Sequence, residues 1–379
     1  MVRSLRRARL AVTLVFFAHG AVFGTWAARI PAIRADLDLT TGELGTALLA
    51  GTIGGVGVLP IAGLVVARRG SRPTVVWGLP LFALMLPALA LASNLPLLAL
   101  ALLASGVVGG AVDVAMNAHG LAVERFYESP IFSSMHAAWS FGGLAGGVGA
   151  ALAAGLDVDP VPHFTGVAIV LGIAGVVASQ RFLPAAADRP EEPPRLGLPP
   201  LRLLPLAVLA FAGLFAEAAA MDWSAVYVAG PAGGDEELAP LGFAAFSLAM
   251  ALFRLVGDPL TSRLGPVAVT RVGGVTAAVG LALALAAATV PGALAGFVLM
   301  GAGLAAVVPI VFRAAGSLPG LPTGAGVAAI TTVGYAAFIV APPTIGFVAD
   351  ASSLRTALWI VVALVVMLVP LARVTRTAE

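Results

Sequence analysis

Long apolar segments recur along the whole chain, and they constrain the fold more than any other feature of the sequence. Each segment has close to the roughly 20 residues that an α-helix needs to cross about 30 Å of hydrocarbon. The sequence therefore predicts an all-α membrane protein with twelve transmembrane helices in two six-helix halves. The predicted spans are 10–30, 43–67, 74–93, 96–119, 133–155, 164–184, 203–228, 240–262, 267–289, 292–314, 324–348 and 354–373.

The composition excludes a water-soluble domain and predicts the lipid bilayer as the solvent. Hydrophobic residues make up 60% of the 379 residues and charged residues only 11%, whereas soluble domains carry roughly 25% charged residues. The chain has no Cys, so a disulfide, a catalytic thiol and a thiolate metal site are all excluded. We expect no cofactor and no metal. The basic residues lie in short loops between apolar spans, so they do not predict a nucleic-acid partner.

The distribution of Arg predicts the orientation, because cytoplasmic loops of membrane proteins are enriched in basic residues. If the N-terminus is inside, the inner segments hold 17 of the 21 basic residues, all of which are Arg. The outer segments then hold only Arg29, Arg34 and Arg355, and Arg254 lies within a span. We therefore expect a multi-pass protein of the bacterial cytoplasmic membrane with both termini in the cytoplasm.

The longest hydrophilic stretch, residues 185–202, follows the sixth span and divides the chain. It predicts a six-helix bundle at 1–184, a cytoplasmic linker at 185–202 and a second bundle at 203–379. The halves repeat each other weakly, since ARRG at 67–70 follows the second span and SRLG at 262–265 follows the eighth. Internal repeats of membrane spans are typical of secondary transporters, in which two halves rock around a central site.

The loop after the second span carries a motif, GLVVARRGSR at residues 63–72. Together with the six-plus-six layout, this motif resembles the major facilitator superfamily. The resemblance implies that Arg68, Arg69 and Arg72 belong to an inner gate. Ala67 stands where that family has an acidic residue.

A narrower resemblance, to the fucose-permease-like branch and its bacterial inner-membrane members, covers essentially the whole chain. It rests on FF at 16–17, WAARIP at 26–31, Asp113 followed by Asn117, MHAAWSFG at 135–142, and the segment from Glu217 to Ser224. In sugar–proton symporters of that branch, an acidic residue followed by Asn on the fourth helix is implicated in proton coupling and sugar binding. The resemblance implies this role for Asp113 and Asn117. Ala27 stands where the sugar permease has a carboxylate.

Carboxylates within the spans are candidates for function, because a charge at the bilayer centre costs at least about 2.5–3.5 kcal/mol. Asp113 and Asn117 are four residues apart and share a helical face. A carboxyl group removed from water can bind and release a proton near neutral pH, as a proton-coupled carrier requires. Glu217 and Asp222 are five residues apart, about 140° around the helix. We expect one of these two to face a cavity while the other contacts a neighbouring helix.

Further polar and aromatic residues complete the predicted site. Arg254 and Asp258 are four residues apart on one helix, and we expect them to form an intramembrane ion pair near the cytoplasmic gate. A neutral His within a membrane acts as a hydrogen-bond bridge or as a proton acceptor, and both readings stay open. The remaining substrate or proton-coupling candidates are His136, Ser140, His19, Trp26, Trp139 and Trp223.

These features predict a secondary active transporter, which we expect to act as a monomer on a small solute and on protons. The chain has no Lys and no phosphate-binding loop, so it carries no P-loop ATPase of its own. An efflux carrier of the same fold is the alternative. A membrane-embedded enzyme is disfavoured, because the four His are scattered. A sensor is also disfavoured, because we see no attached signalling domain. The polar candidates suit a hydroxylated neutral solute, a nucleoside or an amphiphilic cation.

Overall fold

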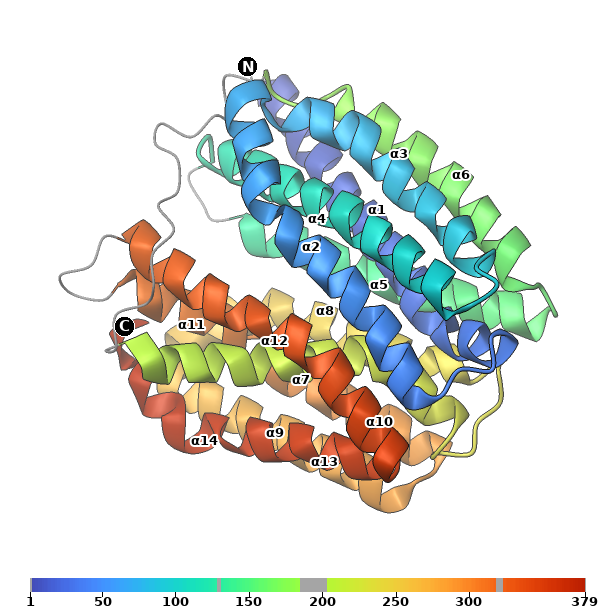
Figure 1. Ribbon diagram of the computed structural model, residues 1–379. Helices are drawn as coiled ribbons and strands as arrows, with labels where there is room; N and C mark the ends of the chain where they lie inside the picture. The colour runs from blue at the N-terminus through green and yellow to red at the C-terminus, as the bar shows by residue number, and fades with distance from the viewer. Residues whose placement is uncertain (1, 128–130, 185–202, 318–322, 379) are drawn as a thin grey trace.

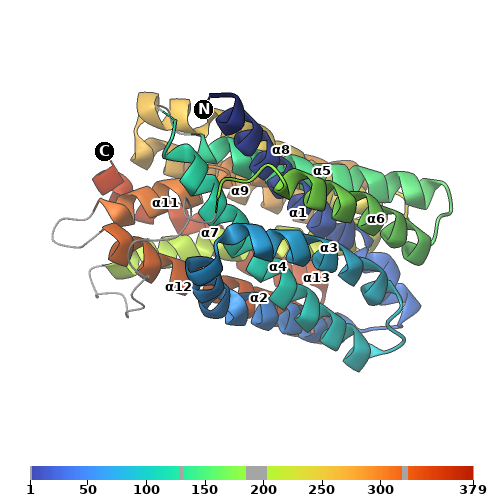
Figure 2. The same cartoon turned by 90° about the horizontal axis from the view of Figure 1, so that it is seen from above.

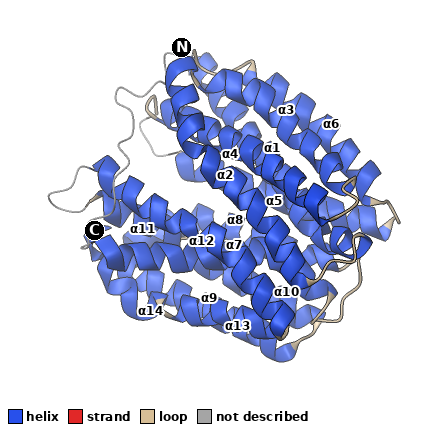
Figure 3. Ribbon diagram, viewed as in Figure 1, coloured by secondary structure: helices blue, strands red, loops and turns tan. Residues whose placement is uncertain are grey.

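The computed structural model describes residues 2–127, 131–184, 203–317 and 323–378, and all regular elements among them are helices (Figure 3). Twelve helical segments are long and apolar enough to cross a membrane, as the sequence predicts. The first half contains α1 (Val2–Asp36), α2 (Thr41–Arg69), α3 (Ser71–Ala90), α4 (Leu95–Glu124), α5 (Phe132–Gly155) and α6 (Pro160–Ser179). The second half contains α7 (Leu204–Ala229), α8 (Ala239–Leu264), α9 (Pro266–Ala287), α10 (Val290–Leu304), α11 (Val307–Gly316), α12 (Thr323–Ala351), α13 (Leu354–Val366), α14 (Leu368–Leu371) and the 3-10 helix η2 (Ala372–Ala378).

Two of the predicted spans are broken. The tenth consists of α10 and α11, separated by a turn at Ala305 and Ala306. The twelfth ends its first helix at Val366, four residues before Pro370. Because Pro370 has no backbone N–H, it cannot donate to the Val366 carbonyl, which explains the break. The predicted linker, residues 185–202, lies outside the described residues.

The repeat inferred from the loops has a structural counterpart. Gly70 ends α2 with φ 78° and ψ 170°, and Gly265 ends α8 with φ 79° and ψ 154°. Both backbones lie in a region that only glycine adopts readily. In each case the next helix begins at the following residue. The second and eighth spans therefore end in the same way.

The two halves lie at an angle, and their helices converge toward one end (Figure 1). Contacts between the halves run mainly along α5 with α8 and α2 with α12, which are matching pairs under the repeat. Both chain ends lie toward the other end of the molecule in two perpendicular views (Figures 1 and 2). We call that end, where α2, α4 and α8 finish, the terminal face. The other end, where α1, α5 and α12 finish, is the closed face.

Small residues allow the halves to touch near the closed face. A Cβ on Gly45 of α2 would come within 2.8 Å of the Pro342 carbonyl oxygen of α12. A Cβ on Gly147 of α5 would come within 3.1 Å of the Ala244 side chain of α8. Thr41 also donates a hydrogen bond to Asp350 across the same interface, at 3.3 Å. Small residues at such positions let membrane helices approach closely.

The outer surface is apolar, as a bilayer requires. Leu100, Val170 and Leu283 are 61%, 65% and 56% exposed, and Trp77 is 79% exposed. In water these side chains would form large apolar patches that soluble monomers do not show. The exposed leucines and valines are therefore expected to face lipid.

Candidate functional site

A cavity of about 670 Å³ lies between the two halves and is lined by residues of both. It reaches toward the terminal face, where its lining includes Asp258 and Arg313, whose side chains are 46% and 49% exposed. At the closed face the halves are in contact instead. As far as the described residues show, a solute would therefore reach the cavity from the terminal face.

Seven of the ten predicted substrate or proton-coupling residues line this cavity. Glu217 and Asp222 both do so, which corrects the expectation that only one of them faces a cavity. The prediction for Trp223 is wrong, since its side chain is fully buried in the core and does not line the cavity. Trp223 follows Asp222 on α7 but points about 100° away from it around the helix, into the core. The seven lining residues are His19, Trp26, Asp113, His136, Trp139, Glu217 and Asp222.

Asp113 and Asn117 form a local pair on α4. The Asn117 amide nitrogen donates to Asp113 Oδ1 at 3.1 Å and to the Asp113 backbone carbonyl at 2.8 Å. Asn117 itself does not line the cavity, whereas Asp113 does. Among the described residues, no basic side chain forms an ion pair with Asp113. The carboxyl group is thus oriented by Asn117 and, within the described ranges, has no ion-pair partner.

His19 bridges three helices of the first half. Its Nε2 lies 3.1 Å from the Gly109 carbonyl oxygen of α4, and its Nδ1 accepts a hydrogen bond from Trp139 Nε1 of α5 at 2.9 Å. Nε2 must therefore carry the ring proton, and the imidazole is neutral with both nitrogens in use. Of the two roles left open for His19, the geometry favours the bridge. The consequence is that Trp139 is held in one orientation at the cavity wall.

Arg254 does not form the predicted ion pair with Asp258. Its Nη2 donates to Glu217 Oε1 of α7 at 3.0 Å, and its Nη1 donates to Ser140 Oγ of α5 at 2.9 Å. Asp258 accepts instead from Arg313 Nη2 of α11 at 3.0 Å. Helical spacing indicated only that Arg254 and Asp258 share a face, whereas the long Arg254 side chain reaches a neighbouring helix. Arg254 and Ser140 also connect the two halves beside the cavity.

His136 contacts aromatic rings at the cavity wall. Its ring packs edge-on against Phe16 and Phe132, with centroids 5.2 and 4.8 Å away. Ser140, one turn further along α5, donates a 3.3 Å hydrogen bond to the His136 carbonyl. Ser140 does not line the cavity itself, but it accepts a hydrogen bond from Arg254, which does.

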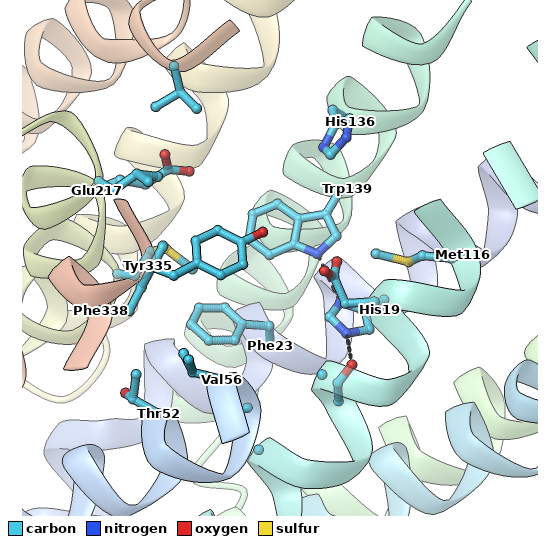
Figure 4. A pocket seen from close by; sticks show the side chains of 18 of the residues that line it. His19, Phe23, Thr52, Val56, Met116, His136, Trp139, Glu217, Tyr335 and Phe338 are labelled. Atoms are coloured by element: carbon cyan, nitrogen blue, oxygen red, sulfur yellow. Dashed lines mark hydrogen bonds between the residues drawn. The ribbon is translucent and has the colours of Figure 1, made fainter. Parts of the chain in front are cut away.

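Aromatic side chains from both halves gather in the middle of the cavity (Figure 4). Phe23 lies 5.9 Å from Trp139 in the first half, and Tyr335 lies 6.0 Å from Phe338 in the second. Tyr335 lines the same cavity as Asp113 and Glu217. The sequence analysis missed Phe23, Tyr335 and Phe338. Tyr335 could have drawn notice, since the chain has only three Tyr.

The motif arginines lie at the terminal face and not in the cavity. Arg68 and Arg69 are exposed at the end of α2. Arg72 donates a 2.9 Å hydrogen bond to Gln180, which follows α6 in the same half. Their predicted gate role stays a prediction.

A second site that the sequence analysis missed lies at the closed face. Arg29 of α1 is 1% exposed, yet it donates to Glu236 Oε1 at 2.7 Å and to the Val158 carbonyl oxygen. Val158 belongs to the first half and Glu236 to the α7–α8 loop of the second. Arg29 therefore joins the two halves where they are in contact. Its position among acidic outer residues was a signal that could have identified it.

Comparison with known proteins places the chain among transporters. It is 34% identical to an uncharacterized transporter of Sinorhizobium fredii over 94% of this chain and 96% of that protein. It is 33% identical to an uncharacterized MFS-type transporter of Yersinia pestis over 97% and 96% of the two chains. No family model matches the sequence.

Solved structures share the fold at low sequence identity. A mutant form of the nucleoside transporter NupG superposes with a TM-score of 0.76 at 14% identity, over 97% of this chain and 99% of that one. The Escherichia coli fucose:proton symporter FucP superposes with a TM-score of 0.65 at 16% identity, over 97% and 98%. At such identities the likeness shows the fold alone. It agrees with the resemblance drawn from the sequence.

Proposed function

We propose that this chain, which belongs to the major facilitator superfamily of transporters, moves a small organic solute across the bacterial cytoplasmic membrane by alternating access coupled to protons. The observation that carries the proposal is the cavity between the halves, which reaches the terminal face and holds Asp113 with no basic partner among the described residues. A carboxyl group in such a place can take up a proton in one orientation of the halves and release it in the other.

The Arg distribution assigns the terminal face to the cytoplasm under this proposal. The conformation described here is then open to the inside. Outward opening requires the α5–α8 and α2–α12 contacts to separate near the closed face and the terminal face to close. The Arg254–Ser140 contact joins α8 to α5, so it must change in that movement.

Transport in proteoliposomes tests the proposal. A ligand-dependent thermal-shift screen on the purified protein first selects a solute that binds. The labelled solute should then accumulate in proteoliposomes when a pH gradient is imposed, and a protonophore should abolish the accumulation. Solute that only equilibrates across the bilayer, with or without the gradient, would exclude proton coupling. Comparing both orientations of the protein in vesicles distinguishes uptake from efflux.

The contact between Arg29 and Glu236 should act as a latch that exists only while the closed face is shut. Glu236→Gln removes the charge that pairs with the buried Arg29, so the outward-open population should increase. Glu236 is 60% exposed, so we expect an effect of about 1 kcal/mol, roughly a fivefold change in the population ratio. Spin labels at Asp36 and Ser352 should report a larger share of long distances, since both residues are exposed at that face.

The chain has no native Cys, so a pair of introduced cysteines carries the only labels. Labels at Arg69 and Ser262 on the terminal face should report a matching rise in short distances. Glu237→Gln is the matched control, because it removes the same charge from an exposed neighbour in the same loop. An equal shift in both variants would mean that loop charge, and not the latch, determines the equilibrium.

A further inference from the structure

The charges that line the cavity do not balance among the described residues. Four carboxylates face it but only two guanidinium groups do. Both guanidinium groups are already paired, Arg254 with Glu217 and Arg313 with Asp258, each at 3.0 Å. Asp113 and Asp222 are therefore left without a guanidinium partner in the part of the chain that the structure describes. His19 cannot supply a positive charge, because both of its ring nitrogens are engaged in its neutral form.

Asp222 is the more exceptional of the two carboxylates. Asp113 at least accepts a hydrogen bond from Asn117. For Asp222 the described part of the chain shows no hydrogen bond and no ion pair, although it lines the cavity from α7. Burying a carboxylate is unfavourable unless it is paired or hydrogen-bonded. A positively charged group on the solute would remove that penalty. A charged solute would therefore bind more tightly than a neutral solute of the same shape.

The aromatic walls of the same cavity suit an organic cation. Phe23, Trp139, Tyr335 and Phe338 present ring faces and edges in the centre of the cavity (Figure 4). Aromatic faces attract cations within about 6 Å, most strongly where water is excluded. His19 holds the Trp139 indole by its N–H, so this wall is already oriented before a solute arrives.

The same walls are poorly equipped for a neutral sugar. A sugar needs several polar partners arranged around its hydroxyl groups. Among the described residues, four hydroxyl side chains line the cavity, and two of them are committed, since Thr52 donates to the Leu48 carbonyl and Thr261 to the Gly257 carbonyl. Ser105 and Tyr335 are the lining hydroxyl groups left for a solute, fewer than the several partners that a sugar needs.

We propose that the cavity binds a small ring-bearing organic amine in its protonated form, with the ammonium group on Asp222 and the ring against Trp139 and Tyr335. Asp113 then remains available for the coupled proton. This inference rests on the proposed function for its biological meaning, because a transported solute is what the site would bind.

Matched pairs of ligands that differ only in charge test the inference. Calorimetric titration of the purified full-length protein would compare phenethylamine, tyramine and cyclohexylamine with 2-phenylethanol, tyrosol and cyclohexanol. We expect at least one amine to bind at least tenfold more tightly than its alcohol. Asp222→Asn should remove that preference while the alcohol still binds, and Asp222→Glu should retain the preference. Asp157→Asn is the control, since it makes the same charge change at an exposed loop residue outside the cavity.

Three results would overturn the inference: no amine of the set binds, alcohols bind as tightly as amines, or the preference survives in Asp222→Asn. Binding is measured without a gradient, so these results are independent of proton coupling. If a neutral solute accumulates on a pH gradient and the amines do not bind, the proposed function stands and this inference fails. If an amine binds but no gradient drives it into proteoliposomes, the binding site stands and the coupling fails.

Discussion

Asp113→Asn should abolish the accumulation of solute driven by a pH gradient, so that the internal-to-external ratio falls to one. The amide has nearly the shape of the protonated carboxyl group but cannot release a proton. The introduced amide can still interact with Asn117, whose side-chain nitrogen lies 3.1 Å from the present Asp113 Oδ1. The variant should therefore insert and fold. Exchange of labelled for unlabelled solute at equal pH should continue, because exchange requires only that the loaded carrier alternates.

Measuring exchange and accumulation in the same variant distinguishes a coupling defect from a folding defect. A folding defect would remove both activities together, whereas loss of the coupling proton removes accumulation alone. Asp157→Asn controls for the loss of one negative charge, since Asp157 is exposed and its φ of 53° is one that Asn tolerates. If Asp113→Asn accumulates solute as well as the wild type does, Asp113 takes no part in proton coupling. Asp222 would then be the remaining candidate for the coupled proton.

The sequence predicted the membrane spans well, because hydropathy reports directly on the solvent of each helix. The ARRG and SRLG loops likewise predicted a structural repeat, since glycine at a positive φ leaves a local signature. The break at Ala305 and Ala306 was not predicted, although the sequence holds a local signal for it. Pro309 has no backbone N–H and cannot donate to the Ala305 carbonyl, just as Pro370 cannot donate to the Val366 carbonyl.

The sequence predicted seven of the residues that line the cavity, but it did not predict the pairings between side chains. Asp113, Glu217 and Asp222 are detectable because a carboxylate within an apolar span is costly. Local spacing placed Arg254 beside Asp258, but the structure pairs it with a residue 37 positions away. Contacts between helices depend on how the halves pack, and a single sequence holds no direct record of that packing. The pairing of Arg29 with Glu236 was missed as well, although the acidic outer residues around Arg29 were a local signal for it.

Removal of Arg254 should destabilise the protein far more than removal of Arg313, although the two ion pairs have the same 3.0 Å separation. The side chains of Arg254 and Glu217 are 15% and 11% exposed, so Arg254→Gln leaves a largely buried carboxylate without its partner. Breaking a buried pair in this way costs about 3–5 kcal/mol. Arg313 and Asp258 are about half exposed, and such pairs contribute about 0–1 kcal/mol. Unfolding midpoints in detergent should show this difference directly.

A double-mutant cycle tests whether the penalty arises from the stranded charge or from lost packing. If the charge is responsible, adding Glu217→Gln to Arg254→Gln should restore most of the lost stability, because both charges are then absent. Adding Asp258→Asn to Arg313→Gln should change little. If the double variant of the buried pair is as unstable as Arg254→Gln alone, then Arg254 stabilises the protein through its packing and its contact with Ser140. In that case Arg254 stabilises the contact between the halves, and Arg254→Met should lower the unfolding midpoint as much as Arg254→Gln does.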